Sequence, residues 1–473
     1  MTLSSRSFWL LLSVAILIRL LSLAGYPLMD TTEARYGEMA RLMVETGNWV
    51  TPQIDYNIPF WGKPPLFTWV SALGIELFGR TEFAVRFPHW LAGIATLAVI
   101  GYFAKKIQVN IYAAILVLAT CGIFAIASGA VMTDMLLTLS IALTMVAIYL
   151  SWQCYERAQG VTRKGYLWGY LGFVGLGVGL LAKGPLAIVL VGLAVFPWLL
   201  IQHGIKGAFV ALWQRFPIIS GSFWMLAIAL PWYLAAEHAT PGFLDYFIVG
   251  EHFKRFIVSG WEGDLYGSAH NQVRGTIWVY WLTSSAPWSF IFPILLWKRK
   301  TDIKTVNTNY RGLFSFLFLW MLAPLVLFTF AGNILPAYVL PGIPALALLV
   351  AVLLKEGDEK WFQGVALIIP VVLIVALIYL NLGKGESRSD KYLLSDMDTS
   401  LSIFYIDKRP FSGQFYSNGR AKLYQGKESL KGLTSMYLIG KKEKVSAVIA
   451  EDGLHCDLQI SAKSKRNRYL CTR

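Results

Sequence analysis

Residues 29–65 read MDTTEARYGEMARLMVETGNWVTPQIDYNIPFWGKPP, and they separate two apolar runs of the chain. The stretch is too polar to cross a bilayer, because a membrane helix needs about 20 consecutive, mostly apolar residues. It opens with carboxylates, continues as an amphipathic helix and closes on an aromatic-rich loop with a lysine before two prolines. Since most of the remaining chain is apolar, we interpret this stretch as a structured loop outside a membrane domain.

The overall composition is that of a membrane protein. Of the 473 residues, 56% are hydrophobic and 14% aromatic, which is typical of polytopic membrane proteins and unusual for soluble domains. The net charge of +14 would indicate nucleic acid in a soluble protein. Here the basic residues lie largely in loops between apolar segments, so we expect membrane lipids and phosphates as partners, and no nucleic acid.

The apolar segments predict a polytopic all-α membrane domain of about eleven transmembrane helices over residues 1–382. The basic loops 105–106, 156–164, 206–215, 298–311 and 355–360 all fall on one side if the N-terminus is cytoplasmic. This arrangement places the outer loops 27–80 and 236–274, and the C-terminal tail, on the other side. The helices are centred near Leu17, Ala95, Leu118, Leu143, Gly175, Val191, Met225, Leu282, Leu319, Leu346 and Val372.

The tail, residues 383–473, is charged and contains runs with the composition of strands. LSIFYI (401–406), SMYLIG (435–440) and VSAVIA (445–450) each predict a strand, and together they indicate a small soluble α/β domain. A long domain crosses the membrane regardless of its charge, so its basic character is compatible with a non-cytoplasmic position.

Cys456 and Cys471 are the only cysteines of the tail. An oxidising outer compartment favours their pairing. The segment between them predicts two strands joined by a polar turn centred on residues 463–467. Such a hairpin would bring the two Cα atoms within about 4.4–6.8 Å, the distance of a disulfide. The alternative is two unpaired thiols, one of them on a frayed terminus.

Three carboxylates are candidates for catalysis. Asp30 and Glu33 fit a capping box, with Asp30 as N-cap and Glu33 at the third helical position. The same helix start, just outside the membrane, also suits a phosphate ligand or a general base. Asp134 begins an apolar segment after SGAVMT, where a carboxylate is costly unless it is paired or functional. The plainer alternative for Asp134 is a helix N-cap.

The candidate ligand residues lie on the same outer side. Arg35 and Tyr36 follow Glu33 directly, and they either contact substrate or cover the flank of the helix. Lys183, in LLAKGPLA, is either a phosphate ligand or a solvated interfacial lysine.

Two further outer segments carry candidates. EHFKRF, which contains His252 and Arg255, could bind a metal or a diphosphate, although one histidine is a weak metal signal. Tyr338, in AGNILPAYVLP, is either a site residue or an interfacial anchor.

These pieces resemble a known family. TEARYGEMARLMVETGNWVTP, the KPP loop, Asp134, AKG, PWYLAAE, EHFKRF, SSAPW and LPAYVL are similar, in order and spacing, to the polyprenyl-phosphate-sugar glycosyltransferases of the GT-C superfamily. Within that superfamily, the chain resembles the lipid A aminoarabinose transferases and the protein O-mannosyltransferase-like proteins. The resemblance covers residues 26–349.

The resemblance implies a GT-C-like fold and sugar transfer from a lipid phosphate on the non-cytoplasmic face. It implies that an acidic residue of the first outer loop, Asp30 or Glu33, is catalytic. It implies that the lysine of the KP motif and further residues of the outer segments bind the donor phosphate. These ligands are Lys63, Lys183, His252, Arg255 and Tyr338.

Two positions depart from the family pattern. Aminoarabinose transferases carry adjacent Asp and Glu before the Arg-Tyr pair, whereas here Thr32 takes the Asp place. They also carry a glutamate before the Lys-Pro, which is proposed to bind a metal with the later histidine. That place is Gly62 here, which argues against a bound zinc or other divalent metal and against aminoarabinose as the sugar.

The main hypothesis is an inverting inner-membrane glycosyltransferase. It would move a sugar from a polyprenyl-phosphate donor, such as undecaprenyl phosphate, to an envelope acceptor such as lipid A, lipopolysaccharide or another glycan on the periplasmic face. The alternative is a lipid-linked sugar flippase or transporter. A transporter predicts polar residues near the bilayer midplane and paired repeats, whereas the polar residues here gather at the outer face.

Overall fold

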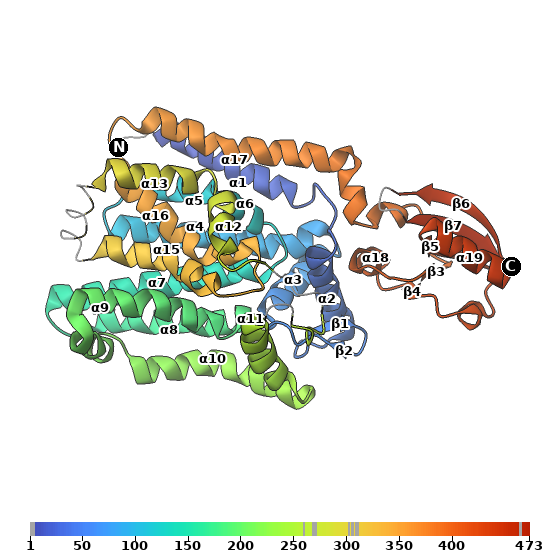
Figure 1. The fold of residues 1–473 in the computed structure, drawn as a ribbon, viewed down its shortest axis with the longest axis horizontal. Helices are drawn as coiled ribbons and strands as arrows, with labels where there is room; N and C mark the ends of the chain where they lie inside the picture. Colours follow the sequence, from blue (N-terminus) through green and yellow to red (C-terminus); the bar gives the residue numbers. More distant parts are fainter. Residues whose placement is uncertain are drawn as a thin grey trace.

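The computed structural model describes residues 5–258, 261–266, 272–300, 303, 307, 312–462 and 466–473. It is an elongated molecule with a large helical bundle and a small sheet domain at one end (Figure 1). The N-terminus lies at the far end of the bundle and the C-terminus lies on the sheet domain. The predicted fold class, a helical membrane domain with a small C-terminal α/β domain, is confirmed.

Apolar helices form the bundle. In chain order they are α1 (Ser5–Ser22), α4 (Glu82–Lys106), α5 (Ile111–Ala119), α6 (Gly122–Ala127), α7 (Thr133–Ala158), α8 (Arg163–Lys183), α9 (Leu186–Arg215), α10 (Ile218–Ala239), α12 (Thr276–Ser284), α13 (Trp288–Lys298), α15 (Leu313–Thr329), α16 (Ile343–Leu353) and α17 (Glu359–Tyr379).

Each of the eleven predicted centres lies in a helix, but the described residues give seven helices long and apolar enough to span a membrane. An eighth span arises if α12 and α13, which meet at 95°, count as one. The segment near Leu118 is divided into α5 and α6. The N–H of Gly122 at this break donates to the Ala286 carbonyl between α12 and α13 (2.9 Å), so two interrupted segments meet there. The number eleven stays a prediction.

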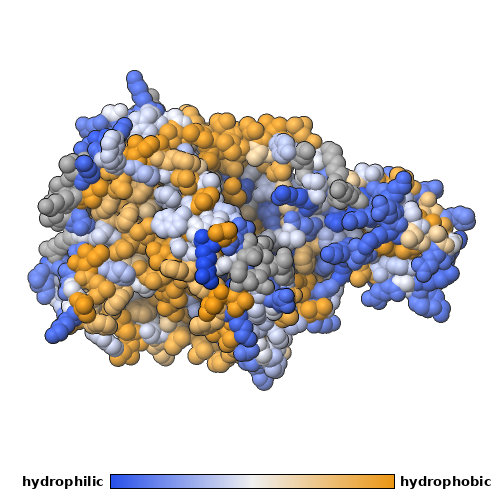
Figure 2. Space-filling view, in the orientation of Figure 1, coloured by the Kyte–Doolittle hydropathy of each residue, from blue (hydrophilic) through white to orange (hydrophobic). Residues whose placement is uncertain are grey.

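The surface agrees with a membrane-embedded bundle. On the face drawn in Figure 2, hydrophobic residues cover most of the helical bundle and hydrophilic residues gather at both ends of the molecule. The ends of α9 and α13 and the start of α17 lie at the end that holds the N-terminus, whereas the first outer loop lies at the end next to the sheet domain (Figure 1). The basic segments 206–215 and 355–360, and the described start of 298–311, therefore lie at the end of the bundle opposite the first outer loop.

The first outer loop is folded as predicted. It contains α2 (Thr32–Thr46), a hairpin of β1 (Gln53–Asp55) and β2 (Ile58–Pro59), and α3 (Leu66–Phe78). Helix α2 buries an apolar face that includes Met39 and Met43, and it ends at Gly47, whose φ of 67° is the left-handed conformation that glycine adopts without strain. The second outer segment contains a π-helix, η1 (Asp245–Lys254), and α11 (Arg255–Ile257).

The C-terminal domain is a five-stranded mixed sheet in the order β4-β3-β5-β7-β6. β3 is parallel to β4 and β5, whereas β7 is antiparallel to β5 and β6. The strands are β3 (Ser402–Tyr405), β4 (Ala421–Leu423), β5 (Ser435–Gly440), β6 (His455–Ser461) and β7 (Asn467–Thr472), with helices α18 (Phe411–Tyr416) and α19 (Lys442–Asp452). Short 3-10 or π turns, η3 (Leu380–Lys384), η4 (Gly385–Arg388), η5 (Lys391–Leu393) and η6 (Lys427–Leu430), complete the tail.

Two of the three predicted strands are confirmed and one is wrong. VSAVIA (445–450) forms α19 instead of a strand. Val445 and Val448 are spaced three residues apart and are buried on one side of the helix, which is the helical period. Gly453 ends the helix in the left-handed conformation. Tertiary packing of this face outweighs the strand propensity of valine and isoleucine.

The predicted disulfide is confirmed. Strands β6 and β7 form an antiparallel hairpin in which Cys456 lies opposite Cys471, and the two are bonded. Their Cα atoms are 4.0 Å apart, slightly closer than the expected window. Residues 463–465 of the predicted turn lie outside the described residues.

Candidate functional site

The capping box predicted at the start of α2 is wrong. Thr31 occupies the N-cap, and no side chain caps the helix there. The Asp30 carboxylate instead accepts hydrogen bonds from the backbone N–H (3.0 Å) and the hydroxyl of Ser412 in α18. Burial raises the pKa of Asp30, although the bonds from Ser412 and the charge of Arg466 oppose this. Asp30 thus fastens the first outer loop to the C-terminal domain.

Glu33 pairs with Arg86 of α4. The two carboxylate oxygens accept from the guanidinium at 2.8 and 2.7 Å. Arg86 is fully buried and also donates to backbone carbonyls at the end of the first helix, Leu23 and Tyr26 among them. Glu33 further accepts from the N–H of Val131 (3.4 Å). It therefore links α4 to the turn that precedes α7.

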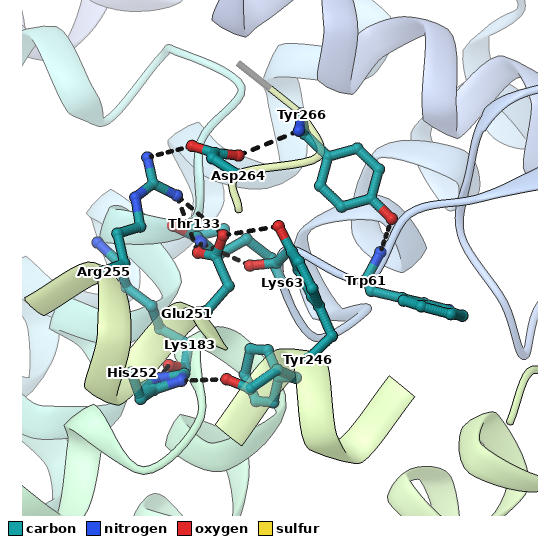
Figure 3. Close-up of polar contacts among 12 residues, drawn as sticks. Trp61, Lys63, Thr133, Lys183, Tyr246, Glu251, His252, Arg255, Asp264 and Tyr266 are labelled. Atoms are coloured by element: carbon teal, nitrogen blue, oxygen red, sulfur yellow. Dashed lines mark hydrogen bonds and ion pairs between the residues drawn. The ribbon is translucent and has the colours of Figure 1, made fainter. Parts of the chain in front are cut away.

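Arg35 and Tyr36 also support the loop. Arg35 donates to the Tyr266 carbonyl (2.7 Å), and the ring of Tyr36 is buried against Phe60 and Phe67. The Tyr266 hydroxyl donates to the Pro59 carbonyl and accepts from the N–H of Trp61 (Figure 3). These contacts hold the segment that leads to Lys63 against the second outer loop.

Lys63 lies in a cluster with the residues of EHFKRF. Its ammonium donates to Glu251 at 2.7 Å, and Arg255 reaches the same carboxylate at 2.9 Å (Figure 3). Arg255 also pairs with Asp264 at 3.3 Å. Although burial raises the pKa of Glu251, the charges of Lys63 and Arg255 hold it below its ordinary value. Glu251 thus brings two basic side chains from different loops together.

A second buried pair adjoins this cluster. Lys183 lies 2.5 Å from Asp134, and both side chains are buried. Asp134 is in the first turn of α7 and Lys183 in the last turn of α8, the two helix ends that favour these charges. The Lys183 ammonium lies 4.3 Å from the centre of the Tyr338 ring. Asp134 is therefore an ion-pair partner.

Tyr338 connects the two pairs. It lies in η2 (Pro336–Gly342), with its ring beside the Lys183 ammonium and near Lys63, Arg255 and Glu251. The structure therefore places Lys63, Lys183 and Arg255 near one partly buried tyrosine.

His252 faces backbone groups on both sides. Its Nδ1 lies 2.8 Å from the Phe247 carbonyl, and its Nε2 lies 3.4 Å from the Lys183 carbonyl. Burial lowers the pKa of His252, with a smaller contribution from Lys63, and the two carbonyls oppose this. His252 therefore ties η1 to the end of α8.

The place at which the family pattern carries a metal-binding glutamate is Gly62 in this chain. Glycine offers no side-chain ligand at that place, and both Glu251 oxygens accept from basic side chains. Among the described residues, no group of three or more His, Cys, Asp or Glu side chains is arranged to hold a metal ion.

Sequence reasoning missed several residues that build the site. Asp264 and Tyr266 lie in the second outer loop, and Asn333 donates from Nδ2 to the Arg255 carbonyl (2.7 Å). The sequence places Asn333 on a turn, but only the packing of that turn against α11 shows that it holds Arg255. Arg86 lies within an apolar helix. Because burying an unpaired arginine there costs free energy, its presence in the sequence indicates a partner elsewhere in the fold.

Known proteins share this arrangement of elements. The structure of ArnT from Cupriavidus metallidurans bound to undecaprenyl phosphate aligns with a TM-score of 0.73 at 18% identity, over 99% of this chain and 98% of that one. The archaeal oligosaccharyltransferase AglB from Archaeoglobus fulgidus aligns with a TM-score of 0.51 at 10% identity, over 92% of this chain and 69% of that one. These likenesses show the fold.

Curated relatives agree in sequence. An undecaprenyl phosphate-alpha-4-amino-4-deoxy-L-arabinose arabinosyl transferase of Pseudomonas fluorescens (strain Pf0-1) is 28% identical over 409 residues, 83% of this chain and 65% of the relative. One from Aeromonas salmonicida (strain A449) is 30% identical over 367 residues, 75% of this chain and 62% of the relative. The chain thus spans somewhat less than two thirds of the length of these relatives.

The family described as dolichyl-phosphate-mannose-protein mannosyltransferase matches residues 8–247. This match includes the first outer loop, Lys63, Asp134 and Lys183, and it extends over half of the chain. The chain therefore belongs to the dolichyl-phosphate-mannose-protein mannosyltransferase family.

Proposed function

We propose that the protein is a membrane glycosyltransferase that moves a sugar from a polyprenyl-phosphate donor, such as undecaprenyl phosphate, to an envelope acceptor. The observation that carries this proposal is the gathering of Lys63, Lys183 and Arg255 around Tyr338 at the outer end of the bundle. Basic side chains there suit the phosphate of a lipid whose chain remains in the membrane. The names of the curated relatives support a sugar carried on undecaprenyl phosphate.

The reaction is proposed as a single displacement that inverts the anomeric carbon. The acceptor oxygen forms a bond to that carbon while the bond from the carbon to the phosphate oxygen breaks. The electron pair goes to the polyprenyl phosphate, where negative charge develops. Lys63, Lys183 and Arg255 stabilise that charge, the electrostatic role that usually contributes most to such catalysis.

Asp134 is our first candidate to orient the acceptor hydroxyl and take its proton. It is the proposed catalytic carboxylate that pairs directly with one of the three basic residues, Lys183. Glu33 contacts the turn before Asp134 and would position it, while Asp30 lies against the C-terminal domain. If the acceptor is itself a phosphate, no base is needed and the carboxylates only position groups.

Transfer is proposed to proceed without a divalent metal. Gly62 supplies no ligand, and Lys63 and Arg255 occupy the carboxylate of Glu251. We expect chelation with EDTA to leave the rate unchanged. A rate that falls on chelation and returns with zinc or magnesium would contradict this proposal.

The experiment that tests the function is conversion of a polyprenyl-phosphate sugar by the purified protein. Reconstituted protein is given undecaprenyl-phosphate sugars and a mixture of lipid A and lipopolysaccharide, and mass spectrometry follows free undecaprenyl phosphate and the modified acceptor. Release of the phosphate with a new sugar on the acceptor supports transfer. Movement of intact donor across the vesicle membrane without release would favour the transporter hypothesis.

The location is proposed as the bacterial inner membrane, with the site and the C-terminal domain in the periplasm. The basic loops support this orientation, because they gather at the end opposite the C-terminal domain. Alkaline phosphatase fused after Arg473 should be active. A fusion that is inactive there, while a cytoplasmic reporter at the same place is active, would contradict this orientation.

A further inference from the structure

A cavity of about 470 Å³ lies between the first outer loop and the C-terminal domain. Asp30, Thr31 and Asp55 line it from the outer loop, and the segment before and within α18 lines it from the other side. Its volume is within the range of small-molecule sites, roughly 300–1,000 Å³. The proposed transfer site does not include this cavity.

The cavity is connected to the proposed site through the start of α2. Asp30 and Thr31 line the cavity, and Glu33, in the next turn, accepts from the N–H of Val131 just before Asp134. Helix α2 packs against α18, at the end of the helical bundle next to the sheet domain (Figure 1). Asp30, which lines the cavity, and Glu33, which contacts the turn before Asp134, are therefore only three positions apart.

The charged lining is balanced in sign. Several of the charged side chains that line the cavity already form ion pairs. Asp55 pairs with Arg409, Asp407 pairs with Lys444 (2.8 Å), and Arg466 pairs with Asp390 (3.0 Å). Three carboxylates and three basic side chains face the cavity: Asp30, Asp55, Asp407, Lys408, Arg409 and Arg466.

This balance selects the class of ligand. A phosphate would lie close to three carboxylates, and an ammonium group close to three basic side chains, with unfavourable Coulomb energy in each case. A hydroxyl both donates and accepts hydrogen bonds, so it matches a lining that contains both acceptors and donors. Phe411 and Leu423 add apolar surface, against which the C–H face of a sugar ring can pack.

We propose that this cavity binds an uncharged saccharide portion of the acceptor. The inference rests on the proposed function, because it takes the acceptor to be an envelope glycan or glycolipid. Asp30 and Asp55 accept hydrogen bonds from sugar hydroxyls, while Arg409 and Gln414 donate to them. The site would hold the acceptor outside the membrane and direct its reacting hydroxyl toward Asp134.

The test uses the full-length protein in detergent and saturation-transfer difference NMR. The probes are neutral di- and trisaccharides of glucose, galactose and mannose, with glucosamine and inorganic phosphate as charged comparisons. Leu423→Trp fills the cavity from its rim, where Leu423 is 40% exposed. Leu458→Trp is the matched control, because Leu458 is also exposed and lies on β6, the opposite edge of the same sheet.

We expect at least one neutral saccharide to give a signal that Leu423→Trp abolishes and Leu458→Trp retains. Both variants should keep the wild-type midpoint of thermal unfolding, which excludes misfolding as the cause. Neutral saccharides that give no signal, or signals that Leu423→Trp leaves unchanged, would overturn the inference. Binding of only phosphate or glucosamine in the cavity would overturn the assigned ligand class.

The outcome separates this inference from the proposed function. The protein could bind saccharide in a way that depends on Leu423 and yet convert no polyprenyl-phosphate sugar. This result would support the saccharide site and contradict the proposed transferase activity. The protein could instead convert the donor but show no saccharide binding that depends on Leu423. This result would support the transferase activity and contradict the saccharide site.

Discussion

Lys63 and Glu251 lie 188 positions apart in the chain, yet the Lys63 ammonium is 2.7 Å from the Glu251 carboxylate. Each residue belongs to a different outer loop. Their contact, with Arg255 on the same carboxylate, turns two separate basic motifs into one cationic site. Glu251 thereby limits the repulsion between the two cations before a phosphate arrives.

Removing either basic residue should weaken use of the donor. A hydrogen bond to a charged group is worth about 1.5–3 kcal/mol, so we expect Lys63→Ala or Arg255→Ala to raise the Kd for undecaprenyl phosphate by about 10- to 150-fold. Lys254→Ala is the control, because Lys254 is adjacent in sequence, equally charged and exposed. Equal affinity in all three variants would show that Lys63 and Arg255 do not bind phosphate.

The Asp134–Lys183 pair can be tested for catalysis apart from stability. Asp134→Asn leaves a buried lysine without its partner, which typically costs about 3–5 kcal/mol. The double variant Asp134→Leu with Lys183→Met removes both charges and should restore the thermal midpoint. We expect this folded double variant to transfer sugar at least about 10²-fold more slowly. Near-normal transfer would assign the pair a structural role alone.

His252 should make stability depend on pH. The pKa of His252 in the folded protein lies below the ordinary value of 6.5. As the pH falls below 6.5, the histidine of the unfolded chain therefore binds a proton while that of the folded protein stays neutral. Stability is therefore complete above pH 6.5 and decreases as the pH falls toward the folded pKa. The Glu251 contribution is lost only at lower pH, because its pKa is held below 4.5.

The measurement is the thermal midpoint of the detergent-solubilised protein from pH 7.5 to 5. We expect the wild-type midpoint to decrease over this range and His252→Gln to flatten the decrease. His238→Gln, which changes an exposed histidine of α10, should behave like the wild type. A wild-type slope that His252→Gln leaves intact would assign the pH dependence to other groups.

The Cys456–Cys471 bond should stabilise the C-terminal domain without taking part in transfer. Closing a loop of 15 residues contributes about 3 kcal/mol in the chain-entropy model. We expect the double variant Cys456→Ser with Cys471→Ser to make the domain more sensitive to limited proteolysis while the rate of transfer stays unchanged. Cys154→Ser, which removes a free cysteine, serves as the control. A wild-type protease pattern in the double variant would contradict the stabilising role.

The sequence by itself determined the membrane class, the polar outer loops and the disulfide hairpin. These features depend on local composition: apolar runs partition into lipid, the signs of loop charges set their sides, and two strands joined by a short turn bring their ends together. The family motifs also indicated Lys63, Lys183, His252, Arg255 and Tyr338, and the structure brings these residues into one region.

Only the tertiary structure decided which partners the charged residues have. Asp30 and Glu33 fit a capping box locally, but Ser412 and Arg86 bind them instead. A buried carboxylate gains more from a complementary donor across the fold than from an exposed helix cap, since burial strengthens the interaction and penalises an unpaired charge. In the same way, VSAVIA (445–450) became α19 because the sheet offered its valines an apolar face to cover. Such partners lie far away in sequence, and only the packing of the elements brings them together.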